Sequence, residues 1–335
     1  TDILKVIKVI LILQDSLIEL AEKHTETLVP SYTHLHPAQP VTLAHVLIAY
    51  VDALQRNVKR LEETLPRVNL CPMGAGAIAT TSFPISRSRT AELLGFSNIL
   101  ENSLDAVGSR DFLLETLAKM TLLATDISRM VEDLIIWSSP DFGIIDLPES
   151  FAFTSSIMPQ KKNPDVLEVI RARMSQILGN FVTSATTLKA LPSGYNLDLQ
   201  EVTPKLWESI ETVSTSLCML SELFKNLDVN QNIFTKQILN YSTTTELANL
   251  LVKKYNIPFR TSHRIVGAVV KILLEKKLAL SDLTPELLNK TAKEFAGINL
   301  VVKLLDIKDS IDPKKFVESH KAVGGPAPVE VKRML

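Results

Sequence analysis

The feature that most constrains the fold of this chain is the spacing of its apolar residues. Over five long stretches, apolar side chains recur at alternating steps of three and four residues. This period places each set along one stripe of an α-helix, as in helices that pack into bundles. Alternation typical of strands is almost absent, so the sequence predicts an all-α, long-helix bundle. The stretches run from Ile3 to Leu20, Leu47 to Leu65, Leu113 to Leu134, Val166 to Phe181 and Leu206 to Phe224.

Several of these helices carry a second apolar stripe, as Phe112, Leu123, Met130 and Trp137 do in the third stretch. A helix that is apolar on two sides needs neighbours on both. The composition agrees, because 46% of the 335 residues are hydrophobic and only 11 are glycine. We therefore expect a bundle whose subunits pack against one another.

The character of the chain changes near residue 237. Shorter helical pieces follow, separated by the helix-breaking segments Asn256-Ile257-Pro258, Leu283-Thr284-Pro285 and Gly324-Gly325-Pro326. We predict a central long-helix bundle domain with the catalytic loops over residues 1–236. A small C-terminal helical domain is predicted over residues 237–335.

Charge and cysteine content argue against several classes of function. The 36 Lys and Arg nearly balance the 37 Asp and Glu, so the net charge of −1 does not favour nucleic acid as a partner. Cys71 and Cys218 each stand alone, which argues against a disulfide framework and fits a reducing compartment. Lys5, Lys8 and Asp15 interrupt the apolar first helix, so it does not resemble a membrane span or a signal peptide. We expect a soluble, cytoplasmic protein.

Two stretches between the long helices do not fit helical periodicity. Residues 30–42 hold three prolines and two histidines. Residues 138–163 form a connection longer than a helical bundle needs, and long connections that end in a well-formed helix start are typical of lids.

The end of the second stretch predicts an anion site. Asn163-Pro164-Asp165 supplies an N-cap, a proline at the first helical position and an acid in the first turn. Lys161 and Lys162 stand just before it, so two ammonium groups and the positive end of the helix dipole converge there. A small carboxylate fits such a site. For so short a motif in isolation, a surface loop with solvated lysines is the commoner explanation.

The histidines and glycines between the helices do not indicate a metal site or a nucleotide site. His34 and His36 could bind a metal, but no Cys, Asp or Glu nearby completes a ligand set. As a catalytic group, His34 needs a carboxylate partner, for which Glu168 is a candidate. Gly74-Ala75-Gly76 lacks the third glycine and the preceding strand of a dinucleotide loop, so no nucleotide cofactor is expected.

Taken together, these segments resemble the fumarase/aspartase superfamily, whose members eliminate fumarate from succinyl-type substrates. Residues 154–164 resemble its signature loop, and the run Gln160-Lys161-Lys162-Asn163-Pro164-Asp165 is most similar to the argininosuccinate lyases and their δ-crystallin relatives. The likeness spans nearly the whole chain. Further matching stretches lie at residues 33–40, 72–77, 102–112, 195–201 and 324–328.

The resemblance implies β-elimination of argininosuccinate to arginine and fumarate, without a metal or an organic cofactor. It implies that Ser155 abstracts the proton and His34 protonates the leaving group, although the reverse assignment is chemically reasonable. Glu168 would polarise His34, and Lys161 would stabilise the carbanion. The substrate-holding residues that it implies are Thr33, Asn163, Tyr195 and Gln200. It also implies a homotetramer with sites shared between subunits.

Three departures from the family pattern stand out. Val202 and Thr203 occupy positions where the family usually has an acid and a lysine, so one contact to substrate is expected to be missing. Thr80 replaces a common glycine, with no consequence evident from the sequence. The chain begins after the family's N-terminal domain and its Ser-Arg-Asn-Asp-Gln motif, so part of a site is expected to be absent.

Two alternatives remain at this point. An adenylosuccinate lyase-type member would need a phosphate-binding set of residues that the sequence does not display. A catalytically silent, crystallin-like structural relative is the other alternative, and the retained Ser155, His34, Lys161 and Glu168 count against it.

Overall fold

The computed structural model describes residues 1–158, 160–235, 239 and 241–335. The chain divides into two compact units, of which unit 1 comprises Thr1–Leu17 and Tyr50–Asp228, and unit 2 comprises Ile18–Ala49 and Val229–Leu335. The division falls within helices α1 (Asp2–Lys23) and α2 (Leu43–Glu62). The boundary predicted between residues 236 and 237 lies outside the described residues and stays a prediction.

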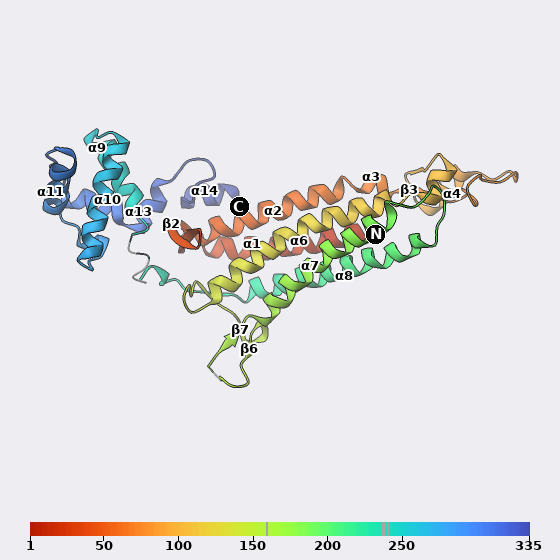
Figure 1. The fold of residues 1–335 in the computed structure, drawn as a ribbon, viewed down its shortest axis with the longest axis horizontal. Helices are drawn as coiled ribbons and strands as arrows, with labels where there is room; N and C mark the ends of the chain where they lie inside the picture. The colour runs from red at the N-terminus through yellow and green to blue at the C-terminus, as the bar shows by residue number, and fades with distance from the viewer. Residues whose placement is uncertain (159, 236–238, 240) are drawn as a thin grey trace. The chain divides into compact units, whose positions relative to one another are not determined.

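Unit 1 is a bundle of long helices, as the periodicity predicts. Its main helices are α6 (Asp111–Ser138), α7 (Asp165–Leu188) and α8 (Asp198–Lys225), which run side by side in Figure 1. Both predicted stripes of α6 face protein: Leu117 and Ile127 of the first are buried, and so are Leu123 and Trp137 of the second. The expectation that α6 has neighbours on two sides is therefore confirmed.

A few polar contacts tie the helices of unit 1 together. The Ser16 and Ser221 hydroxyls are 2.7 Å apart in the buried interior, and the Asn57 side-chain amide donates to Asp126 at 2.7 Å. Because a buried polar group without a partner is costly, such pairs favour one register of the helices over others.

The segment between α2 and α6 is built from short elements. The Arg87 guanidinium donates to the carbonyl oxygens of Met73, Leu100 and Glu101, and so holds the two ends of this segment together. Thr80 adopts φ +57°, a left-handed conformation that glycine adopts without a steric penalty. Because Thr80 stands where the family commonly has glycine, this backbone position is strained, which the sequence did not reveal. The elements are α3 (Leu65–Val68), β3 (Leu70–Cys71), α4 (Arg87–Leu94), β4 (Asn98–Ile99) and α5 (Ser103–Gly108), with β3 parallel to β4.

The long connection between α6 and α7 also contains short elements. These are β5 (Ile145–Asp146), the 3₁₀ turn η1 (Glu149–Phe151), β6 (Phe153–Thr154) and β7 (Lys162–Asn163). After α8, the strand β8 (Asp228–Val229) and the turn η2 (Ile233–Thr235) follow.

Unit 2 combines a β-hairpin with short helices. The helix boundaries predicted at these segments are confirmed. Asn256 ends α9 in a left-handed conformation, and the Thr284 hydroxyl caps α11. Leu251, Ile265 and Leu288 lie in one buried core. The helices are α9 (Thr244–Tyr255), α10 (Phe259–Glu275), η4 (Leu280–Asp282), α11 (Pro285–Ala296), α12 (Leu304–Ile311), α13 (Pro313–Ser319) and α14 (Pro328–Met334).

The proline-rich stretch forms the hairpin of unit 2. Strands β1 (Leu28–Thr33) and β2 (His36–Thr42) pair antiparallel, with Thr33 opposite His36. The two-residue turn consists of His34 and Leu35, at φ +55° and +59°. Positive φ at both positions is what a type I′ turn requires, and Asn-Gly is its usual sequence. The turn is therefore strained, because a branched leucine occupies a position that favours glycine.

We predict that Leu35→Gly raises the free energy of unfolding by about 1 kcal/mol, because glycine adopts this backbone conformation without a steric penalty. Little packing is lost, since the Leu35 side chain is 64% exposed. Urea unfolding followed by circular dichroism measures the change.

The matched control is Leu93→Gly, which removes a leucine that is 69% exposed from the helix α4. There glycine should lower the free energy of unfolding by about 0.5–1 kcal/mol. If both substitutions destabilise the protein, the turn is not strained.

Candidate functional site

Ser155 lies at the end of a two-stranded hairpin. Phe153 pairs with Asn163, and Thr154 with Lys162, while the Ser155 amide donates to the Lys161 carbonyl at 3.0 Å. The Ser155 hydroxyl oxygen accepts from the backbone amides of Ile157 and Met158, at 3.3 and 3.1 Å. Two amide donors thus converge on the oxygen predicted to react.

The predicted helix start of α7 is wrong in detail. Pro164, and not Asn163, is the N-cap, and no side chain caps the helix. Asn163 is drawn into strand β7, and the Asp165 carboxylate accepts from the Phe153 amide at 3.1 Å, which ties the hairpin to the helix. The first-turn amides of α7 therefore have no side-chain cap.

The two lysines do not act alike. Lys162 forms an ion pair with Asp146 at 3.2 Å, so its charge is partly compensated. Lys161 is exposed and takes part in none of the ion pairs among the described residues. Lys161 and the α7 N-terminus together form a positive spot beside Ser155 that can bind a carboxylate. Glu168, one turn into α7, is also exposed.

Tyr195 and Gln200 lie beyond the other end of α7. The Gln200 amide donates to the Tyr195 hydroxyl at 2.5 Å, so the two side chains are held together. The 24 residues of α7 span about 36 Å, and they separate this pair from Ser155 and Asn163 along the bundle (Figure 1). Within one subunit, the predicted site residues of unit 1 therefore do not all lie together.

Thr33 and His34 belong to unit 2, where both are exposed at the tip of the hairpin. His45, at the start of α2, is different, because burial lowers the pKa of its imidazole and favours the neutral form. The pairing of His34 with Glu168 joins residues of different units and stays a prediction. Among the described residues, no three His, Cys, Asp or Glu side chains cluster closely enough to hold a metal ion.

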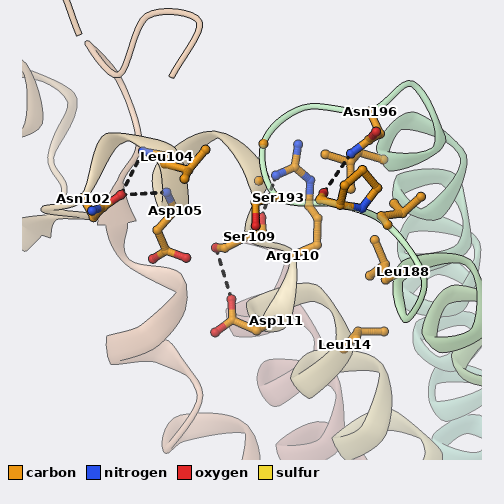
Figure 2. A pocket seen from close by; sticks show the side chains of 15 residues that line it. Asn102, Leu104, Asp105, Ser109, Arg110, Asp111, Leu114, Leu188, Ser193 and Asn196 are labelled. Carbon is orange, nitrogen blue, oxygen red and sulfur yellow. Dashed lines mark hydrogen bonds between the residues drawn. The ribbon is translucent and has the colours of Figure 1, made fainter. Parts of the chain in front are cut away.

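A cavity of about 440 Å³ adjoins the Tyr195 segment, and the sequence assigned it no role. It lies between residues 102–111 and 188–199 of unit 1, and Asp105, Arg110 and Asp111 line it (Figure 2). The resemblance covered residues 102–112, but charged residues near a helix start look like solvated caps. No local signal marked them as a site.

Comparisons with known proteins agree with this architecture. Residues 2–179 match the family described as Lyase, and residues 241–318 match the family described as Argininosuccinate lyase C-terminal. A protein of Methanococcus aeolicus named argininosuccinate lyase is 45% identical over 335 residues, covering 99% of this chain and 67% of that protein. One from Methanocaldococcus jannaschii with the same name is 47% identical, covering 95% of this chain and 65% of that protein. The chain thus spans about two thirds of the length of these curated relatives.

Solved structures share the architecture of this chain. EDDS lyase in complex with formate superposes with a TM-score of 0.92 at 32% identity, covering 99% of this chain and 67% of that one. A class II fumarase from Schistosoma mansoni has a TM-score of 0.75 at 20% identity, covering 92% and 66%, and shares the fold. Within the described residues, no helix is long and apolar enough to span a membrane. By these matches over almost its whole length, the chain belongs to the argininosuccinate lyase family of the fumarase/aspartase superfamily.

Proposed function

We propose that the protein splits argininosuccinate into arginine and fumarate by β-elimination. The observation that carries the proposal is the 45% identity, over 335 residues, with a relative named argininosuccinate lyase. The hairpin of Ser155 at the uncapped start of α7 supplies groups suited to that chemistry.

Ser155 is the proposed base. It removes a proton from the carbon next to a succinyl carboxylate, and the electron pair left behind is delocalised into that carboxylate. Expulsion of the guanidinium nitrogen then forms the double bond of fumarate. The amides of Ile157 and Met158 stabilise negative charge on the serine oxygen, while Lys161 and the α7 N-terminus stabilise the charge on the carboxylate.

His34 is the proposed acid, which protonates the departing nitrogen, and Glu168 favours its charged form. The assignment of base and acid can be reversed, since a serine must lose its own proton before it acts. Thr33, Asn163, Tyr195 and Gln200 hold the substrate in this proposal. Thr203 leaves the usual lysine contact unfilled, while Val202 is buried in the bundle.

The proposed compartment is the cytoplasm. Cys71 and Cys218 are free thiols in the structure, buried and exposed respectively, and an exposed free thiol suits a reducing environment.

The proposed substrate is tested directly. We expect the enzyme to release fumarate from argininosuccinate and not from adenylosuccinate, as followed by fumarate absorbance. The relatives support the first substrate by name. Turnover of adenylosuccinate alone would move the protein to the other lyase class, and turnover of neither would favour a silent, structural relative.

For the proposed base, Ser155→Ala should lower kcat by about 10²–10⁴-fold, while KM changes little. The hydroxyl acts mainly in the transition state, which explains the split between the two constants. Ser156→Ala is the matched control, because Ser156 is an exposed neighbour in the same hairpin. A near-normal kcat in Ser155→Ala would remove this residue from the mechanism.

A homotetramer with shared sites is the proposed assembly. Ser155 and Tyr195 lie beyond opposite ends of α7, whose 24 residues span about 36 Å, which is too long for one small substrate to reach both in one subunit. Exposed apolar side chains along the long helices support association: Leu11 of α1, Leu122 of α6, Leu178 of α7 and Trp207 of α8 are examples. Copies related by symmetry can bring the separated groups together.

We predict that mixing two inactive variants, Ser155→Ala and Tyr195→Phe or His34→Asn, restores part of the activity after subunit exchange. A mixed assembly contains some sites with neither substitution, provided that the two residues come from different subunits. Light scattering should give about four times the mass of 37.1 kDa. Failure of every pair of variants to complement would defeat the shared site, and a monodisperse monomer would defeat the assembly.

A further inference from the structure

Within one subunit, burial does little to fix the position of the hairpin that carries Ser155. Figure 1 shows β6 and β7 projecting from the bundle at the start of α7. The Phe153 side chain in β6 is 72% exposed, and Ile157 beyond it is 87% exposed. The free energy gained from burial scales with the apolar area removed from water, so side chains this exposed contribute little of it. Polar contacts therefore decide where the hairpin lies relative to α7.

Within the described part of the chain, two polar side-chain contacts join this hairpin to the elements around it. The Lys162 ammonium lies 3.2 Å from the Asp146 carboxylate, and both side chains are exposed. An exposed ion pair of this kind contributes little, because a long lysine side chain must be held in one geometry. The half-buried Asp165 instead has a short side chain at the start of α7, and its carboxylate accepts from the Phe153 backbone amide at 3.1 Å. Asp165 therefore anchors the strand itself to a rigid helix.

The anchored amide lies close to the proposed base. Phe153 precedes Ser155 by two residues, which is roughly 7 Å along an extended strand. The Ser155 amide donates to the Lys161 carbonyl, and its hydroxyl oxygen accepts from the amides that follow it. A shift of β6 along α7 would thus move the serine oxygen relative to the start of the helix. Misplacement of a reacting group by about 1 Å can lower a rate by about 100-fold.

We propose that Asp165 is a positioning residue for the proposed base. Its carboxylate holds β6 against the start of α7 and thereby sets the place of the Ser155 oxygen. Asp165 acts through the Phe153 amide and does not itself take part in proton transfer. The inference rests on the proposed function, because it takes Ser155 as the base.

The charge of Asp165 has a second effect, which the test must separate from the first. A carboxylate in the first turn partly compensates the positive end of a helix, so its removal should strengthen the binding of a substrate carboxylate there. Asparagine and alanine both remove the charge, but asparagine keeps an oxygen that can accept from the Phe153 amide. The difference between these two variants therefore isolates the hydrogen bond.

The test compares Asp165→Asn and Asp165→Ala in the full enzyme by their turnover of argininosuccinate. We expect Asp165→Ala to lower kcat by about 10- to 100-fold, and Asp165→Asn to keep it within about threefold. KM should shift by a similar factor in both variants, because that shift reflects the charge that both have lost. Hydrogen exchange gives a readout that does not need activity: residues 151–157 should exchange faster in Asp165→Ala and near normally in Asp165→Asn.

A double variant distinguishes placement of Ser155 from a general effect on the fold. In a Ser155→Ala background, Asp165→Ala should lower kcat by less than about threefold further, because no serine oxygen remains to be placed. Glu149→Ala is the matched control, because Glu149 is an exposed acid in the same connection, and it should leave kcat and exchange within about twofold.

Three outcomes would overturn the inference: a near-normal kcat in Asp165→Ala, equal losses of kcat in Asp165→Ala and Asp165→Asn, or a full further loss in the Ser155→Ala background. Each of these leaves the proposed activity intact, provided that the unaltered enzyme makes fumarate and Ser155→Ala does not. A near-normal kcat in Ser155→Ala, or no fumarate from the unaltered enzyme, would instead defeat the proposed function. Hydrogen exchange in the Asp165 variants would then still report whether the carboxylate anchors the strand.

Discussion

The packing of α6 against α7 and α8 is the constraint on which the rest of unit 1 depends. Because α6 buries apolar residues on two sides, the axes of its neighbours are fixed over most of their length. The candidate site residues of unit 1 lie in or beside the connections at the ends of these helices, with the Ser155 hairpin at one end of α7 and Tyr195 beyond the other. Rigid helices position such connections more precisely than loops could position themselves.

Most of the helical architecture could be predicted from the sequence, because a 3.6-residue period persists through each long stretch. The hairpin over residues 28–42 could not. Its turn residues, His34 and Leu35, are poor turn formers, and its strands contain prolines, which weaken every local strand signal. The N-cap was misassigned because Asn163 pairs with Phe153 across a hairpin, a contact between residues ten positions apart that local capping rules do not include.

For the candidate site too, the sequence predicts some features and not others. Residue types and order identified Ser155, Lys161 and Glu168 as candidates, but they did not reveal that Tyr195 and Gln200 lie beyond the other end of α7 from Ser155. Within one subunit, this separation depends on the length of α7. Arg110 and Asp111 were matched to the family yet given no role, since a charged pair at the start of a helix is usually solvated. They line a pocket only because residues 102–111 meet residues 188–199, at the contact between Gly108 and Gly194.

The described residues of the Ser155 hairpin form a ladder of two residue pairs, and Ile157 near its turn is 87% exposed. Such a segment can open locally at a free energy far below that of global unfolding. Hairpins form in about 1–10 μs, whereas enzymes typically turn over about ten times per second. If this hairpin closes at the usual rate, it can admit substrate and re-form thousands of times within one catalytic cycle. The time needed to re-form the hairpin around the proposed base, Ser155, would then add nothing measurable to the cycle.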